Sequence, residues 1–146
     1  MNWIKYLSYW LWQLSWGFCQ SLLGLLLFLK NRHCPHAFYH GAVLTKWHGL
    51  GCVSLGPFIF AADENNPKLR DKSRAGRMCA HEFAHTVQSL LLGPAYLFVI
   101  GLPSFLWCNL PYFRKLRLEK QIPYGAFYTE KWADHIAEKL FGQKLG

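Results

Sequence analysis

Two histidines and a glutamate in the middle of the chain have the types and the spacing of a metal-dependent hydrolytic site. The sequence there reads His81-Glu82-Phe83-Ala84-His85. On a helix, residues four apart lie on the same face, so His81 and His85 can offer two imidazole nitrogens to one metal ion. Glu82 is rotated about 100° from His81, where its carboxylate can take a proton from a metal-bound water. The pattern predicts a zinc site for peptide-bond hydrolysis, with Glu82 as general base.

The residues around this motif predict the helix that it needs. Apolar side chains recur at helical spacing on a face that lies largely away from the two histidines: Ala80, Phe83, Ala84, Val87 and Leu91. Gly93-Pro94 is a typical helix stop. The alternative is a pair of ordinary helical histidines beside a solvated glutamate, because so short a motif also arises by chance.

A further acidic ligand is needed, because a catalytic zinc usually has three protein ligands and a water. Glu130 and Asp134 lie four apart in a second segment with helical periodicity, which Gly142 would end. We predict that Glu130 binds the metal. Asp134 would accept the second N–H of a zinc-bound histidine, which we assign to His81. Taken alone, the two acids would be a solvated helix face; with the histidine pair they favour a metal site.

The spacing of these motifs resembles that of a known family. The His-Glu-x-x-His pattern at 81–85, followed by Glu130-x-x-x-Asp134, is similar to the gluzincin metallopeptidases. Residues 129–137 also resemble the second helix of the membrane-associated CAAX prenyl-proteases and HtpX-type peptidases, where an acidic ligand precedes Ala-Asp. The resemblance covers residues 74–142 at most.

This resemblance implies an α+β, zincin-like minimal domain with a small antiparallel sheet, a zinc-binding helix and a second ligand helix. It implies that His81, His85 and Glu130 bind Zn²⁺ and that Glu82 is the base. A donor for the transition state cannot be matched by motif. Three residues have suitable chemistry and nothing in the sequence selects among them: Tyr124, Tyr128 and His135.

The composition indicates a membrane-associated protein. Hydrophobic residues make up 52% of the chain and charged residues only 16%, against about 25% charged residues in average soluble domains. The net charge of +8 suits an anionic membrane surface as well as nucleic acid. Because the basic run at 68–77 lacks interleaved aromatics and any recognisable reader motif, we expect membrane lipids and no nucleic acid as partners.

Residues 6–29 carry no charged side chain and are long enough to cross a bilayer, which takes about 20 residues. We therefore predict an N-terminal hydrophobic membrane helix within residues 1–32. The competing interpretation is an in-plane helix, because Gln13, Ser15, Gln20 and Ser21 interrupt the apolar pattern. The basic residues that follow the segment, Lys30 and Arg32, would place the rest of the chain, and the active site, on the cytoplasmic side.

Residues 33–146 form the second predicted unit, the metallopeptidase domain. His33, His36 and His40 are closely spaced, but Pro35 interrupts any helix there, so we interpret them as a polar loop rather than a second metal site. Residues 42–61 are β-prone and punctuated by glycines, which predicts two or three short antiparallel strands. Such a sheet could hold an extended peptide along its edge, or it could simply be a packing surface.

The domain contains an apolar insertion at 90–113. His85 precedes it and Glu130 follows it, so a single membrane crossing would separate the two ligands unless the zinc lay at membrane depth. Two crossings would need about 40 residues. We therefore expect a re-entrant, interfacial or core segment. The five scattered cysteines predict free thiols in a reducing compartment, not disulfides.

The sequence thus favours a membrane-associated zinc metallopeptidase with a peptide or protein substrate. The alternative from a different class is a non-catalytic membrane protein, with a structural metal or with no metal.

Overall fold

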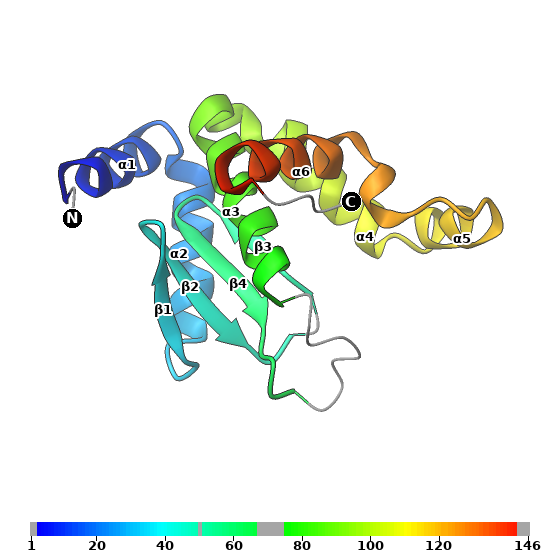
Figure 1. Cartoon of the computed structure of the whole chain (residues 1–146), viewed down its shortest axis with the longest axis horizontal. Helices are drawn as coiled ribbons and strands as arrows, with labels where there is room; N and C mark the ends of the chain where they lie inside the picture. The colour runs from blue at the N-terminus through cyan, green and yellow to red at the C-terminus, as the bar shows by residue number, and fades with distance from the viewer. Residues whose placement is uncertain (1–2, 50, 67–74, 143–146) are drawn as a thin grey trace.

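The computed structural model describes residues 3–49, 51–66 and 75–142, and within them the fold is α+β, as predicted (Figure 1). The helices are α1 (Trp3–Ser15), α2 (Phe18–Lys30), α3 (Ala75–Leu92), α4 (Leu102–Asn109), α5 (Pro111–Glu119) and α6 (Tyr128–Phe141). The strands are β1 (His36–Tyr39), β2 (Ala42–Trp47), β3 (Val53–Leu55) and β4 (Phe58–Ala62). Three short helical turns join the later helices: η1 (Gly93–Ala95), η2 (Leu97–Gly101) and η3 (Tyr124–Ala126). The basic run at 68–77 lies largely outside the described residues.

The four-stranded sheet is mixed, so the prediction of a purely antiparallel sheet was wrong. Its strand order is β1-β2-β4-β3. The pairs β1–β2 and β3–β4 are antiparallel, but β2 and β4 are parallel neighbours. After β2 the chain forms β3 at the far edge of the sheet, and β4 then lies between β3 and β2. Strand β1 was not predicted at all. It is joined to β2 by His40 and Gly41, whose φ angles of 50° and 96° are typical of a tight hairpin turn.

Helices α2 and α3 cover opposite faces of the sheet (Figure 1). All five residues of β4 are therefore buried, as expected of a strand with packed layers on both sides. On the α2 face, the Phe58 ring lies 5.6 Å from Phe28 and 5.7 Å from Trp10. The core on the α3 face is formed by Ala42, Leu44, Ile59, Ala61 and Cys79.

The apolar N-terminal segment forms two helices, not the single helix predicted. Helices α1 and α2 meet at an angle of 102°, and Gly17 lies at the start of α2. The corner packs on the end of α3, where Gly93 has a positive φ of 52°. A side chain at Gly93 would begin 2.2 Å from the Trp16 ring, so glycine is required there for the close approach as well as for the backbone conformation.

The polar residues that interrupt this segment face the protein interior. The Gln13 amide donates a hydrogen bond to the Thr86 carbonyl (3.0 Å) and accepts one from the Ser89 hydroxyl (2.9 Å). The Gln20 amide reaches Ser89 Oγ and the Gly93 carbonyl, both at 2.9 Å. Both glutamines are fully buried. These hydrogen bonds explain the bend, because they draw both helices onto the C-terminal half of α3.

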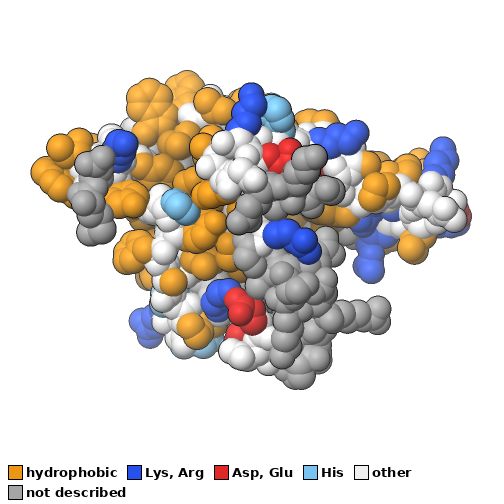
Figure 2. Space-filling view, in the orientation of Figure 1, with side chains coloured by type: hydrophobic (Ala, Val, Ile, Leu, Met, Phe, Trp, Pro, Cys, Tyr) orange, Lys and Arg blue, Asp and Glu red, His pale blue; other side chains and the backbone are white. Residues whose placement is uncertain are grey.

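The outward faces of the same region are apolar, and Figure 2 shows hydrophobic side chains spread over α1. Large exposed residues include Trp3, Leu7, Leu11 and Trp16 in the N-terminal segment, and Phe98, Leu102 and Phe105 in η2 and α4. Among the described residues, no individual helix combines the length and hydropathy of a membrane span. Two sharply bent helix pairs reach that length and composition together, α1 with α2, and Arg77–Ala95 with Leu97–Asn109.

The apolar insertion at 90–113 turns back on itself, with a bend of 117° between its helical parts. Tyr96 is buried at 3% exposure, and α4 returns to α6, where Ser104 Oγ lies 2.7 Å from the Thr129 hydroxyl oxygen. This return keeps the segments before and after the insertion in contact with each other.

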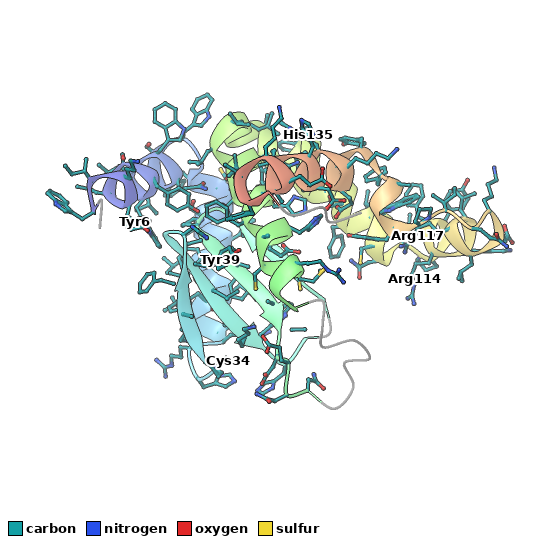
Figure 3. All side chains as sticks on the ribbon, viewed as in Figure 1. Tyr6, Cys34, Tyr39, Arg114, Arg117 and His135 are labelled. Carbon is teal, nitrogen blue, oxygen red and sulfur yellow. The ribbon has the colours of Figure 1, made fainter. Side chains whose placement is uncertain are left out.

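Basic residues follow this insertion on α5 and just beyond it: Arg114, Lys115, Arg117 and Lys120. The Arg117 guanidinium lies 5.2 Å from the Trp107 ring centroid and 5.3 Å from that of Tyr124. Arg117 therefore packs against aromatic rings, while Arg114 and Lys115 remain exposed on the arm that α5 forms (Figures 2 and 3).

Candidate metal centre

The centre lies where α3 and α6 cross. Both helices present alanines to the crossing: Ala80 and Ala84 from α3, Ala133 and Ala137 from α6. These four side chains are buried at 0–2% exposure. Because the distance between packed helices depends on the side chains between them, alanines allow a close approach. Short polar side chains beside the contact can then meet across it.

Three candidate ligands converge beside this crossing. His81 Nε2 lies 3.0 Å from Glu130 Oε2, and His85 Nε2 lies 3.7 Å from the same oxygen. One ligand atom from each residue lies within 4.8 Å of the other two. Glu130 is buried at 2% exposure, and the imidazole of His85 is buried as well. The structure therefore brings together the three residues that the sequence predicted as ligands.

The outer nitrogen of each imidazole is held by an oxygen acceptor. His81 Nδ1 donates a hydrogen bond to Asp134 Oδ1 (2.7 Å), the contact predicted for Asp134. His85 Nδ1 donates to Gln88 Oε1 (2.7 Å), and the Gln88 amide donates in turn to the Thr129 carbonyl (3.2 Å). Metal-binding histidines commonly have such partners, which fix the tautomer and leave Nε2 for the metal.

The second carboxylate oxygen of Glu130 is held in the same way. Glu130 Oε1 accepts hydrogen bonds from Ser104 (3.0 Å) on α4 and from the Thr129 hydroxyl (3.1 Å). Oε2 is thereby directed towards the two histidines. The return of the insertion onto α6 therefore brings Ser104 within hydrogen-bond distance of the candidate ligand Glu130.

The site is strongly coupled electrostatically without a metal. Burial alone would lower the pKa of His81, but its hydrogen bonds to Asp134 and Glu130 outweigh burial and raise the pKa to about 10. Burial would raise the pKa of Glu130, but the hydrogen bonds to His81 and His85 hold it well below its usual range. At neutral pH, His81 is therefore a cation between two carboxylates, and a metal ion would replace its proton.

Glu82, the predicted base, is buried at 5% exposure and is held by the sheet. Ser54 Oγ on β3 lies 2.7 Å from the Glu82 carboxylate and 2.9 Å from the Glu82 carbonyl oxygen. The Tyr96 hydroxyl donates to the Ser54 carbonyl (3.1 Å), which fixes this part of β3. The negative charge of Glu82 contributes to the raised pKa of His81, so the carboxylate lies within electrostatic range of the centre.

Of the three candidate transition-state donors, Tyr124 is 41% exposed but lies within electrostatic range of Glu130. Burial and the charge of Glu130 raise the pKa of the Tyr124 phenol, which keeps it protonated. The Tyr128 hydroxyl donates instead to the Val99 carbonyl. His135 is exposed on α6, at the upper edge of the molecule in Figure 3.

The edge strand next to Glu82 is β3, and much of it is covered. The Ser54 carbonyl is taken by Tyr96. The Leu55 carbonyl is so close to α2 that a side chain at Gly24 would begin 2.4 Å from it. These contacts leave little of this three-residue strand for pairing with an extended peptide.

Neither models of protein families, nor curated proteins, nor solved structures give a match to this chain.

Four residues of the centre were missed by sequence reasoning. Gln88 could have been found, because it lies three residues after His85 and so on the same helical face. Ser54 and Ser104 lie 28 and 26 residues from the glutamates that they hold, and an isolated serine has no spacing that marks it. Thr129 directly precedes Glu130 but its role depends on the return of α4.

Proposed function

We propose that the chain is a zinc-dependent metallopeptidase that works at a membrane on a peptide or protein substrate. One observation carries the proposal: His81 Nε2 and His85 Nε2 converge on one oxygen of Glu130, while the outer nitrogen of each imidazole is held by an acceptor. Two helical histidines with no shared role would not be expected to contact the same buried carboxylate. Nor would the outer nitrogen of each ring be expected to have its own hydrogen-bond acceptor.

The donor set fits zinc. Two imidazoles and one carboxylate, with a fourth position left for water, are the protein ligands of one class of catalytic zinc sites. The three ligand atoms lie within 4.8 Å of one another, and burial of Glu130 and His85 excludes bulk water from one side. Hard cations such as Mg²⁺ prefer all-oxygen ligand sets, which disfavours them here.

Bound zinc would polarise a scissile carbonyl and lower the pKa of a water ligand to about 7. The other steps depend on side chains of the protein. With zinc held by His81, His85 and Glu130, Glu82, held by Ser54, would serve as the general base for that water and would return the proton to the leaving amine. The Tyr124 phenol, which stays protonated, would be the hydrogen-bond donor to the oxygen on which charge develops. Asp134 and Gln88 keep the two imidazoles oriented throughout.

The test of this function is Glu82→Gln, assayed for peptide cleavage and for zinc content. General base catalysis contributes about 10²–10⁴-fold, so the cleavage rate should fall by that factor while zinc is retained. A matched control is Glu64→Gln, because Glu64 is an exposed glutamate that pairs with Lys46. A variant that keeps zinc and cleaves as fast as the wild type would refute the role of Glu82. A zinc-containing wild type that cleaves no peptide would favour the non-catalytic alternative.

The membrane part of the proposal is supported by the exposed apolar faces of α1 and α4 and by the basic residues of α5. We propose that these faces contact lipid and that the centre opens to the cytoplasmic side, where anionic headgroups attract basic residues. Flotation with anionic vesicles tests it. Replacing Leu7 and Leu11 by serine should release the protein from vesicles, whereas Leu118→Ser, at the exposed tip of α5, should have a smaller effect. Equal flotation of the wild type and the double variant would contradict this part.

A further inference from the structure

A second cluster of metal-ligating side chains lies at the end of the sheet remote from α6. His33 and Cys34 precede β1, and His48 directly follows β2. One ligand atom from each of the three lies within 4.8 Å of the other two. Figure 3 places Cys34 at the lower end of the molecule and His135, on α6, at the upper end. We propose that this cluster is a second metal site, separate from the candidate catalytic centre, and that it takes a zinc-type divalent cation.

The backbone that carries the first two ligands is fixed by short hydrogen bonds. The Cys34 N–H donates to the Asn31 carbonyl (2.9 Å) just after the end of α2. The Lys46 N–H donates to the Pro35 carbonyl (2.9 Å), which extends the pairing of β2 past the first residue of β1. The turn that holds Cys34 is therefore tied to the strand that leads to His48.

The third ligand is also held on a fixed segment. The Asp63 N–H donates to the Trp47 carbonyl (3.2 Å), and the Asn66 amide donates to the His48 carbonyl (3.4 Å). The Trp47 indole donates to the Gly51 carbonyl (2.9 Å). The His33 and His48 rings then lie nearly parallel, with centroids 6.1 Å apart. The fold itself therefore places two imidazoles and a thiol together without a metal.

The neighbouring histidines are used elsewhere, which separates this cluster from the histidine tract seen in the sequence. Both nitrogens of His36 are engaged, with Thr45 Oγ1 and with the Arg32 carbonyl, each at 3.1 Å. His40 lies in the hairpin turn among aromatic rings. Interpreting the tract as a polar loop missed this role for His33, because its partners are the adjacent Cys34 and a histidine that follows a distant strand.

The ligand set selects the class of metal. A thiolate and two imidazoles suit borderline and soft cations such as Zn²⁺, whereas Ca²⁺ and Mg²⁺ prefer oxygen ligands. Ligand atoms around a tetrahedral zinc lie about 3.4–3.6 Å apart, so closure requires movements of about 1 Å. The exposed imidazoles of His33 and His48 can make that movement, while the buried Cys34 sulfur is the fixed point. A water would complete the coordination.

Cobalt substitution tests the site without reference to cleavage. The full chain is reduced with a phosphine, freed of metal and titrated with Co²⁺. A sulfur-to-cobalt charge-transfer absorption should form, because this cluster contributes a thiolate whereas His81, His85 and Glu130 contribute only nitrogen and oxygen. The absorption should persist in His81→Ala/His85→Ala and disappear in Cys34→Ser. Cys108→Ser is the matched control and should keep it.

Zinc content gives the second measurement, by which failure of this site and of the catalytic centre are told apart. The wild type reloaded with Zn²⁺ should hold about two zinc ions, and His81→Ala/His85→Ala about one. Adding Cys34→Ser should remove the remaining zinc, and so should His48→Asn, which changes an exposed side chain and leaves the fold intact. A wild type without the sulfur absorption, or triple variants that keep the zinc of the double variant, would overturn the second site. Whether His81→Ala/His85→Ala loses one zinc ion tests only the candidate catalytic centre and leaves the second site unaffected.

Discussion

The N-terminal half of α3 packs against the sheet through apolar side chains, whereas its C-terminal half packs against α1 and α2 through polar ones. In the first region, Cys79 and Phe83 contact an apolar core that includes Ile59, and the buried Ser54–Glu82 pair lies beside it. In the second, Thr86 and Ser89 bind buried glutamines, and the large apolar residues lie outside. Buried polar groups are stable when they are hydrogen-bonded, and apolar exteriors are stable where the surroundings are apolar.

The difference explains where the centre is located. The two regions meet at the middle of α3, within the stretch that carries His81 and His85. The candidate base, Glu82, is held by Ser54 from the sheet, and the candidate ligand Glu130 is held by Ser104 from α4, a further helix with an exposed apolar face. Under the proposed function, a site on this boundary would combine a rigid framework with access to a substrate at a membrane.

Ile59→Ala should have the largest effect on stability, because it opens a cavity in the apolar core between the sheet and α3. Ile59 is fully buried, and such truncations cost about 2–5 kcal/mol of unfolding free energy. Leu11→Ala in α1, where the side chain is 60% exposed, should change stability in detergent very little. Denaturant unfolding of both variants checks the contrast. Similar losses for the two would mean that α1 is packed like the sheet.

Gln13→Leu tests the polar contacts between α1 and α3 by replacing a buried polar side chain with an apolar one. Leucine would leave the Thr86 carbonyl and the Ser89 hydroxyl without their partner, at a cost of about 1–3 kcal/mol. The measurement is again the free energy of unfolding in detergent. A stabilised variant would show that the interior of this region tolerates apolar residues as the sheet core does.

Substitutions of Ser54 on β3 and Ser104 on α4 should separate the contribution of the sheet to the centre from that of α4. Ser104→Ala removes a hydrogen bond behind a ligand, so zinc affinity should fall about 10–100-fold. Ser54→Ala removes the contact to Glu82, so the cleavage rate should fall while zinc affinity stays close to that of the wild type. Competition with a chelator and initial rates measure the two quantities. Equal loss of zinc affinity in both variants would remove the distinction.

The pH dependence of zinc binding should be the smallest effect over a single pH unit. In the metal-free centre the pKa of His81 is raised to about 10, so at lower pH this residue keeps a proton that a metal must displace. Affinity should therefore rise with pH, about tenfold per unit between pH 7 and pH 9. Zinc titrations in matched buffers measure the slope. An affinity independent of pH in this range would contradict the raised pKa.

The two long helices of the centre were predictable, because each has an apolar stripe and a glycine stop. α3 ends at Leu92, before Gly93, and α6 ends at Phe141, before Gly142, whose φ is 66°. The spacing within each helix also fixed which side chains share a face. The sequence could not show that the helices cross at their alanines, but the metal hypothesis required it, and the two helices do pack there.

Other features depend on contacts between distant segments and leave no local pattern. The parallel pairing of β2 with β4 follows from the route of the chain around β3. The break between α1 and α2 follows from glutamines that bind α3, although an apolar run with a few polar residues equally fits one long helix. Strand β1 was missed because, at the sheet edge, His36 faces a threonine on the next strand, and this partner cannot be seen in a single segment.

The zinc content of Glu130→Ala tests the central claim most directly, because Glu130 is the candidate ligand from α6 that meets the two histidines of α3. Relative to wild type, this variant should lose about one zinc per chain, since three protein ligands become two. Glu119→Ala, an exposed glutamate of α5, should lose none and serves as the control. An unchanged zinc content in Glu130→Ala would contradict the account, because the convergence of His81, His85 and Glu130 would then serve packing and not a metal.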